Sequence, residues 1–404
     1  MEDRRSALHV VQIVEAASGG VGRHVRDLVQ QLVGRGVGVS LFFGLSRSDA
    51  GFRAFATDLS SKGSIAVEVE MGTNLAGLFR AALAPRFIEK RLRVHAVRPD
   101  IIHGHSSVGG AVARLLARRM GLPVVYTPHA PIIMNDRLGL TKRTVYGVIE
   151  RHLSRRTDLQ IAVSHAELRL TREQGWRPRN SAVIYSAVPL ITLGAAGRRP
   201  AVQDRLCRVV SVGRLSSQKD PILWRDVAAS SDPKRFEFAW AGSGDLEGNL
   251  RAEGLPASAR LLGHVDDVPA LLGQADVLMM TSRYEGAPLA LLEAMAAGLP
   301  VVCRSFAGAE EIVADGVTGF LVPSSRPADY VAALERLAAS EDLRANMGDA
   351  AQDRVRANFL LATMVNRTLG VYSSLADNGS LGAPRLESEA PAGAGKHLTF
   401  GQAG

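Results

Sequence analysis

The 404-residue chain has only two cysteines, Cys207 and Cys303, and both lie in apolar runs typical of strands. Such a pair cannot form the disulfide framework of a small secreted protein, so we expect buried free thiols. No apolar run reaches the roughly 18–20 residues of a membrane-spanning helix, and the charged opening Met1–Arg5 is not followed by a signal-type core. These absences predict a cytoplasmic protein.

Aromatic residues are also few, at 5%, and lysine occurs only six times among 48 basic residues. Forty glycines favour an α/β chain with many tight turns. The charge is divided unevenly. Residues 1–200 carry 29 basic against 15 acidic side chains, a net of +14, whereas residues 201–404 carry 19 against 25, a net of −6. The two halves should therefore face different partners, and the overall +8 is no argument for nucleic acid.

The first half repeats a pattern of apolar strand, turn and amphipathic helix. A strand at 8–14 leads into Gly19, Gly20 and Gly22, and then into a helix whose apolar residues recur at three-and-four spacing up to Val33. Further strands are predicted at 37–44, 100–103, 123–127, 159–164 and 182–185, with a helix over 108–120. Alternating strands and helices predict a parallel sheet.

The second half repeats this pattern, with strands predicted at 208–212, 236–241, 261–263, 277–280 and 301–302. We therefore expect an α/β protein of two Rossmann-like, doubly wound domains that face a central cleft. The first domain should span 1–190 and the second 206–375, its last helix able to pack back on the first. Residues 191–205 should form a linker, and 376–404 a disordered tail rich in small and polar residues.

The densest motif is the segment from Ser282 to Pro300, which contains Glu285 and Glu293. Pro288 suits the first turn of a helix, and Gly298 and Pro300 end it. Backbone amides at a helix start favour phosphate, whereas paired carboxylate oxygens suit the hydroxyl pairs of a sugar. A second motif joins Gly213, Arg214 and Lys219, two cations beside a glycine turn. Together with Gly242 they predict a site for a sugar attached to a diphosphate.

These motifs resemble glycosyltransferase family 4, whose fold is named GT-B. The resemblance also covers Gly263–Val265, Ala314–Val322 and, in the first half, Gly19–His24, Pro99–His103 and Tyr126–His129, in order over about residues 8–375. It implies a retaining enzyme of the hexosyltransferase type that uses a nucleoside-diphosphate sugar. Tyr185–Val188 departs from the family, which often has Asn-Gly there.

The resemblance also implies roles for individual residues. Arg214 and Lys219 would bind the diphosphate, Glu285 the sugar hydroxyls and Glu293 the ribose. Gly213, Gly242, Gly286, Ala287, Pro288 and Leu289 would line the donor, with His264 and Val265 near the base. Gly19 and Gly20 would approach the diphosphate from the first domain, and His129 would meet the donor sugar. His105 would either cap a helix or face the acceptor.

The resemblance implies front-face displacement, and the absence of an Asp-x-Asp triplet agrees with a site that needs no metal or cofactor. The acceptor would be a glycan or a polyprenyl-linked molecule of bacterial surface polysaccharide synthesis. Basic, partly apolar stretches near residues 79–93 and 137–156 suggest peripheral contact with the anionic inner face of the membrane, against the alternative of a solvated arginine-rich surface. Nucleic acid is not expected as a partner.

Three other functions compete with this one. A sugar-nucleotide epimerase of the same fold would need acid–base carboxylates placed differently from Glu285 and Glu293. A non-catalytic binding protein could keep all four of Arg214, Lys219, Glu285 and Glu293. A dinucleotide oxidoreductase is suggested by Gly19–Gly22, but Gly-x-Gly-x-x-Gly is absent there.

Overall fold

The computed structural model describes residues 8–378, apart from 73, 136–137 and 190–205. The chain divides into two compact units. The first unit ends at Ser186 and also includes the helix that begins at Leu361, and the second runs from Ala187 to Leu360. The predicted linker 191–205 lies outside the described residues, as does the predicted tail 376–404 except for its first three residues. Those three, Ala376 to Asn378, form the end of the last helix, so the predicted start of the tail is wrong.

The first unit is built on a seven-stranded parallel sheet in the order β3-β2-β1-β4-β5-β6-β7. This order reverses direction between β1 and β4, which is the point where doubly wound sheets bind ligands. Its strands are β1 (His9–Val14), β2 (Gly38–Gly44), β3 (Ile65–Val69), β4 (Ile101–His105), β5 (Val124–Thr127), β6 (Leu159–Ala162) and β7 (Asn180–Val183).

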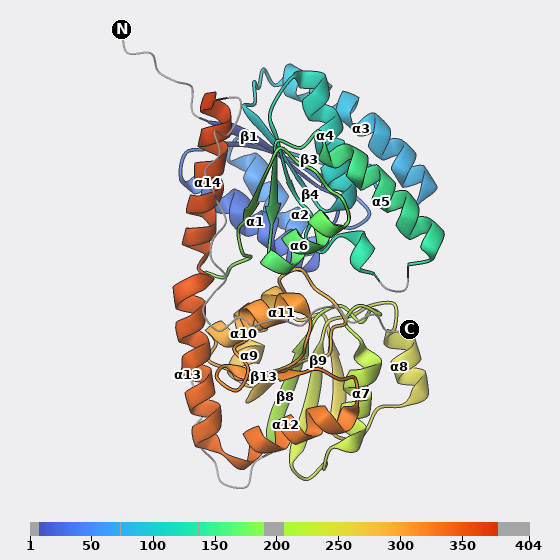
Figure 1. Ribbon diagram of the computed structural model, residues 1–404, viewed down its shortest axis with the longest axis vertical. Coiled ribbons are helices and arrows are strands. Elements are labelled where there is room, and N and C mark those ends of the chain that lie inside the picture. Colours follow the sequence, from blue (N-terminus) through green and yellow to red (C-terminus); the bar gives the residue numbers. More distant parts are fainter. Residues whose placement is uncertain (1–7, 73, 136–137, 190–205, 379–404) are drawn as a thin grey trace. The chain divides into compact units, whose positions relative to one another are not determined.

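Helices cover both faces of this sheet. Helices α3, α4 and α5 lie together on one face, whereas α1 packs with α2 and α14 (Figure 1). The apolar core on the α3–α4 side includes Ile13, Ile88, Ile102 and Leu116. The helices of this unit are α1 (Gly19–Gly34), α2 (Ala50–Ser61), α3 (Leu75–Val94), α4 (Ser107–Met120), the short 3-10 helix η1 (Ile132–Met134), α5 (Leu140–Ser154), α6 (His165–Glu173) and α14 (Leu361–Asn378).

The second unit has a six-stranded parallel sheet in the order β10-β9-β8-β11-β12-β13. Its strands are β8 (Cys207–Val212), β9 (Phe236–Ala241), β10 (Ala259–Gly263), β11 (Val277–Met280), β12 (Val301–Arg304) and β13 (Gly319–Val322). Its helices are α7 (Pro221–Ser230), α8 (Glu247–Glu253), α9 (Val268–Gly273), α10 (Leu289–Ala296), α11 (Ala307–Ile312), α12 (Pro327–Ala339) and α13 (Glu341–Asn358).

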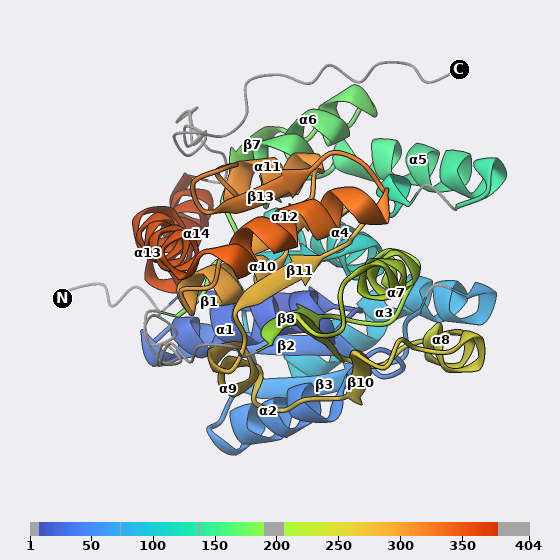
Figure 2. The same cartoon turned by 90° about the horizontal axis from the view of Figure 1, so that it is seen from below.

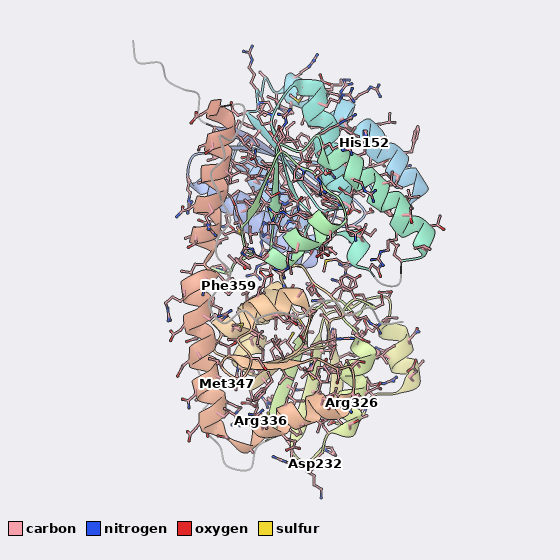
Figure 3. All side chains as sticks on the ribbon, in the orientation of Figure 1. His152, Asp232, Arg326, Arg336, Met347 and Phe359 are labelled. Carbon is pink, nitrogen blue, oxygen red and sulfur yellow. The ribbon has the colours of Figure 1, made fainter. Side chains whose placement is uncertain are left out.

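Aromatic residues hold the core of the second unit together. Trp224 of α7 meets Trp240 of β9 edge-to-face, with the ring centroids 5.5 Å apart. Helix α12 packs on α7 and on the β12–β13 edge (Figure 2). The guanidinium of Arg336 lies 4.2 Å from the ring centroid of Phe320, and Figure 3 shows Arg336 on α12 beside Met347 of α13. These contacts hold α7 and α12 against the sheet.

The predicted α/β class and parallel sheets are confirmed, and the predicted strands lie within a few residues of the observed ones. Two edge strands, β3 and β13, were not predicted. β3 is only partly buried and carries the exposed Glu68, whereas β13 is a largely buried strand of only four residues. Cys207 and Cys303 are buried free thiols, as predicted. Among the described residues, no helix is long and apolar enough to cross a membrane.

Candidate functional site

Two loops at the carboxyl ends of β8 and β11 are joined by hydrogen bonds in the second unit. The amide of Arg283 donates to the carbonyl of Gln218 at 2.8 Å, and the side-chain amide of Gln218 donates to the carbonyl of Tyr284 at 3.1 Å. The hydroxyl of Thr281 donates to the carbonyl of Lys219 at 2.9 Å. These hydrogen bonds bring together two motifs that lie more than sixty residues apart in the sequence.

Lys219 and Glu285, which the sequence analysis predicted for the diphosphate and the sugar, are in direct contact. Lys219 Nζ lies 2.8 Å from Glu285 Oε1, and both side chains are less than one-fifth exposed. Cys303 lies close by; burial raises the pKa of its thiol, and the charge of Glu285 adds to the effect. A cation and a carboxylate so placed could bind a phosphate and a hydroxyl group side by side.

Asp220 holds the backbone between these motifs. It adopts a left-handed conformation, with φ +50°, at the N-terminus of α7. Its buried carboxylate lies 3.0 Å from Arg283 Nε and 3.4 Å from Arg304 Nη1. A carboxylate that is buried and paired with two arginines offsets much of its desolvation cost, so Asp220 can lock Lys219 in place.

The glycines of this site allow the loops to approach closely. Gly213 has φ +149° and Gly242 has φ +129°. A Cβ on Gly242 would lie 2.1 Å from the carbonyl oxygen of Gly213, and a Cβ on Gly213 would lie 2.8 Å from Lys219 Cε. Trp240 Nε1 donates to that same carbonyl of Gly213 at 2.7 Å. The glycine turn is therefore a packed platform beneath Lys219.

The loop that carries Glu285 continues through Gly286 and Ala287 into α10. Pro288 stands at the N-cap and not in the first turn, one residue earlier than predicted. Glu293 is buried on α10, among apolar neighbours. The loop is packed tightly against the start of α11, because a Cβ on Gly308 would lie 2.6 Å from the carbonyl oxygen of Gly286.

The other residues predicted for the donor lie more openly. Arg214 is exposed. His264 follows β10, is 77% exposed, and pairs with the exposed Asp266 at 3.2 Å; Val265 is the next residue. Gly19 and Gly20 belong to the other unit, in the exposed first turn of α1, where Gly19 has φ +56° and neither has an atom within 4 Å of an added Cβ.

The first unit holds a cluster of histidine rings at the carboxyl ends of β4 and β5. His129 follows β5 with φ +53°, and the next residue, Ala130, is also left-handed and donates its amide to Glu167 Oε2 at 2.7 Å. His129 Nε2 lies 3.0 Å from His105 Nδ1. His105 is fully buried, so the expectation that it caps α4 is wrong; Ser106 occupies that N-cap.

His24 of α1 completes the cluster. Its ring meets that of His129 edge-on, with the centroids 4.6 Å apart, and its Nδ1 is buried without a hydrogen-bond partner. Burial lowers the pKa of His24 to about 4 and the pKa values of His105 and His129 well below their usual range, so all three rings are neutral near pH 7. One ring nitrogen from each lies within 4.8 Å of the others, close enough to share a transition-metal ion.

Sequence reasoning missed His24, which belongs to the cluster. It also missed Gln12 and Tyr372, whose hydrogen bonds connect to the cluster. His24 lies in the glycine segment Gly19–His24, and a histidine on an otherwise apolar helix face is a signal that could have found it. Gln12 in an apolar strand is a similar signal. Tyr372 is 360 residues from Gln12, to which it hydrogen-bonds, and no local pattern connects them.

Comparison with known proteins agrees with this architecture. A family model described as glycosyl transferases group 1 matches residues 200–354, and one described as glycosyltransferase family 4 matches residues 18–191. A D-inositol 3-phosphate glycosyltransferase of Streptomyces scabiei is 30% identical over 88% of this chain and 86% of its own. An Escherichia coli UDP-Gal:α-D-GlcNAc-diphosphoundecaprenol α-1,3-galactosyltransferase is 26% identical over 69% and 76%.

Among solved structures, Anabaena HepE in complex with UDP and glucose matches with a TM-score of 0.74 and 20% identity, over 91% of this chain and all of the other. This likeness establishes the two-domain GT-B fold. The chain belongs to glycosyltransferase family 4, as the sequence motifs predicted.

Proposed function

We propose that this glycosyltransferase moves a sugar, with retention of anomeric configuration, from a nucleoside diphosphate to a glycan or lipid-linked acceptor of bacterial surface polysaccharide synthesis. The observation that carries the proposal is the 2.8 Å contact between Lys219 and Glu285 on a glycine platform. A diphosphate is bound by a cation, and sugar hydroxyls are bound by a hydrogen-bond acceptor. The Lys219 ammonium and the Glu285 carboxylate supply these two groups side by side. HepE, solved with UDP and glucose, supports the same donor class.

In this proposal Arg214 and Lys219 neutralise the diphosphate, and Glu285 accepts hydrogen bonds from sugar hydroxyls. Glu293 accepts them from the ribose. The amides of residues 286–289 help to hold the sugar and phosphate, and His264 with Val265 lies by the base. The family resemblance assigns Gly19 and Gly20 to the diphosphate and His129 to the donor sugar, and the proposal keeps these roles.

The chemical step is a front-face displacement. The acceptor oxygen forms its bond to the anomeric carbon on the side from which the phosphate oxygen leaves, and that phosphate oxygen takes the acceptor proton. No side-chain nucleophile is required. The cations of Arg214 and Lys219 stabilise the negative charge that develops on the leaving diphosphate, so we propose that no metal or cofactor is needed.

Thermal stability with and without ligands tests the donor site. We expect nucleoside diphosphates and their sugars to raise Tm, because a ligand that binds only the folded state stabilises it. Lys219→Ala should abolish the shift for both, whereas Glu285→Ala should weaken mainly the additional shift from the sugar. Lys234→Ala is the matched control, since Lys234 is an exposed lysine of the same unit. Absence of any shift in the wild type would refute the donor assignment.

The acceptor side of the proposal rests on the surface of α3 and α5, here named the α3–α5 face. These helices flank α4, and they expose apolar side chains, including Phe79 at 69% and Val148 at 56%. Basic residues accompany them on the same helices: Arg80, Arg86, Lys90, Arg91, Arg93, Lys142, Arg143 and Arg151. Exposed apolar groups among arginines suit the headgroup region of an anionic membrane. The E. coli relative, whose acceptor is a diphosphoundecaprenol, supports this choice.

Flotation with vesicles tests the α3–α5 face. We expect binding to vesicles that contain anionic lipid, and weaker binding at high salt because the attraction is partly electrostatic. Phe79→Glu with Val148→Glu should reduce binding by about tenfold or more. Val317→Glu is the control, because Val317 is equally exposed but lies in the second unit. Binding that is unaffected by salt and by both substitutions would contradict the proposal.

A further inference from the structure

A continuous chain of buried hydrogen bonds runs through the first unit behind His129. It crosses from β5 to β4 and β1, reaches α14 and returns to β4 and β5. Every bond is 2.5–3.0 Å long, and every member except His129 is at least nine-tenths buried. The chain contains, in order, His129, His105, Gln12, Tyr372, His103 and Thr127.

The chemistry of Gln12 gives this chain a direction. Its carbonyl oxygen faces His105 Nε2 at 2.8 Å and can only accept, so His105 carries its proton on Nε2. The burial that lowers the pKa of His105 keeps the ring neutral, which leaves a lone pair on Nδ1. His129 must then donate from Nε2 to His105 Nδ1. The proton of His129 is thereby assigned to Nε2.

Tyr372 satisfies the NH₂ group of Gln12 in the observed orientation of the amide. The NH₂ group of Gln12 donates to the Tyr372 hydroxyl at 3.0 Å, and that hydroxyl in turn donates to His103 Nδ1 at 2.5 Å. His103 then donates a hydrogen bond from Nε2 to the Thr127 hydroxyl at 2.9 Å. If the amide rotated by half a turn, every bond would reverse and the proton of His129 would move to Nδ1.

We propose that Tyr372 and Gln12, acting through His105, are positioning residues that hold His129 as the Nε2–H tautomer. The Nδ1 lone pair of His129 is then available to accept a hydrogen bond from a hydroxyl of the donor sugar. This chain of hydrogen bonds from Tyr372 to His129, here named the relay, is a property of the first unit. Its link to the donor rests on the function proposed above. Helix α14, from the end of the described chain, thus sets the protonation state of a residue in the first unit.

A shared metal ion is the competing explanation of the histidine cluster, because His24, His105 and His129 could each offer a nitrogen. A metal needs lone pairs on both His105 Nδ1 and His129 Nε2. The 3.0 Å contact between these two atoms is also the length of a hydrogen bond, which requires one proton between them. The two arrangements exclude one another, so a metal-binding measurement separates them.

The test uses the full chain labelled with ¹⁵N-histidine, with ring-nitrogen shifts recorded near neutral pH. His129 and His105 are assigned by the signals lost in His129→Gln and His105→Gln. We expect protonated Nε2 on both rings in the wild type. Tyr372→Phe removes the hydroxyl that orients Gln12, so the His129 signals should move toward a mixture of both tautomers.

Tyr330→Phe is the matched control, because Tyr330 is a fully buried tyrosine of the second unit whose hydroxyl has no hydrogen-bond partner. It should leave every His129 signal unchanged. Three results would overturn the relay: a proton on Nδ1 of His129 in the wild type, an unchanged tautomer in Tyr372→Phe, or binding of one equivalent of Zn²⁺, followed by calorimetry, with loss of the His129 Nε2 proton.

Kinetics then test the link to the donor. With a nucleotide sugar that the thermal screen identifies, Tyr372→Phe should lower kcat by about tenfold, the weight of one well-placed hydrogen bond, and Tyr330→Phe should not. Unchanged kcat in spite of an altered tautomer would overturn the positioning role. If the wild type turns over no nucleotide sugar while the tautomer responds as expected, the proposed function fails and the relay stands.

Discussion

At the scale of single residues, the candidate donor site depends on small groups in exact places. Asp220 is left-handed and paired with Arg283 and Arg304, and this arrangement directs Lys219 toward Glu285. None of these contacts needs a large buried area. The approach of the loops beneath Lys219 also requires positions without a side chain, which is why glycine stands at 213 and 242.

The substitution Gly242→Ala tests this requirement. The new Cβ would lie 2.1 Å from the carbonyl oxygen of Gly213, and φ +129° disfavours any side chain. We expect a loss of about 2–4 kcal/mol in the free energy of unfolding, measured by urea denaturation. Gly248→Ala, in α8, has no atom within 4 Å of the new Cβ and should be neutral or slightly stabilising. Equal stability of the two variants would contradict the close approach.

At the scale of elements, α4 is tied both to the sheet and to α5. Arg114 of α4 is fully buried; its guanidinium lies 4.1 Å from the ring centroid of Tyr126 in β5 and pairs with Glu150 of α5 at 2.9 Å. A Cβ on Gly110 would strike the Tyr126 ring at 2.1 Å, so α4 can sit this close only with glycine there. The ion pair therefore fixes the helix layer that carries the α3–α5 face.

Glu150→Gln should be costly, because it leaves the Arg114 charge buried without its counter-ion. We expect a loss of about 3–5 kcal/mol and a clear fall in Tm. Asp58→Asn removes an exposed ion pair with Lys62, both partners being more than half exposed, and should change Tm very little. Scanning calorimetry of both variants makes the comparison. A Glu150→Gln protein as stable as the wild type would show that Arg114 is not buried as described.

At the scale of the whole molecule, the buried histidines of the first unit make the stability of the protein depend on pH. The first unit keeps His24, His103, His105 and His129 neutral by burial, which lowers the pKa of each ring. In the unfolded chain these rings titrate near pH 6.5. As pH falls below about 6.5 the unfolded state takes up protons that the folded state refuses, so stability is lost down to the folded pKa values.

We therefore expect the first unit to lose stability between pH 7 and pH 5. For His24, whose pKa falls to about 4, the loss would reach on the order of 3 kcal/mol by pH 4. Calorimetry across this range should show the fall, and His24→Phe should make it shallower. A flat profile in the wild type would contradict the burial of the histidine cluster.

The sequence indicated that two motifs would meet, because each is short and its residues follow one another in order. Gly213 to Lys219 and Glu285 to Glu293 each fall at the end of an apolar run, and the carboxyl ends of parallel strands meet at one edge of a sheet. The structure brings Lys219 and Glu285 into contact, but the roles of all the residues predicted for the donor remain predictions, and Arg214, His264 and Val265 stand apart from that contact. The sequence did not predict the contacts of His24, Gln12 and Tyr372. Each is a polar residue in an apolar segment, and the local sequence does not show which distant residue it will contact.

The uneven division of charge was the first sign that the two halves differ. The sequence by itself also predicted two parallel sheets, because the hydrophobic periodicity of strands and helices is a local property of the chain. Only the tertiary structure decided that Lys219 touches Glu285 and that Tyr372 of α14 reaches the histidines of the first unit. Contacts between residues so far apart in the sequence depend on how whole helices and strands pack. That packing depends on the volumes and directions of side chains from several elements, which no single segment of the sequence contains.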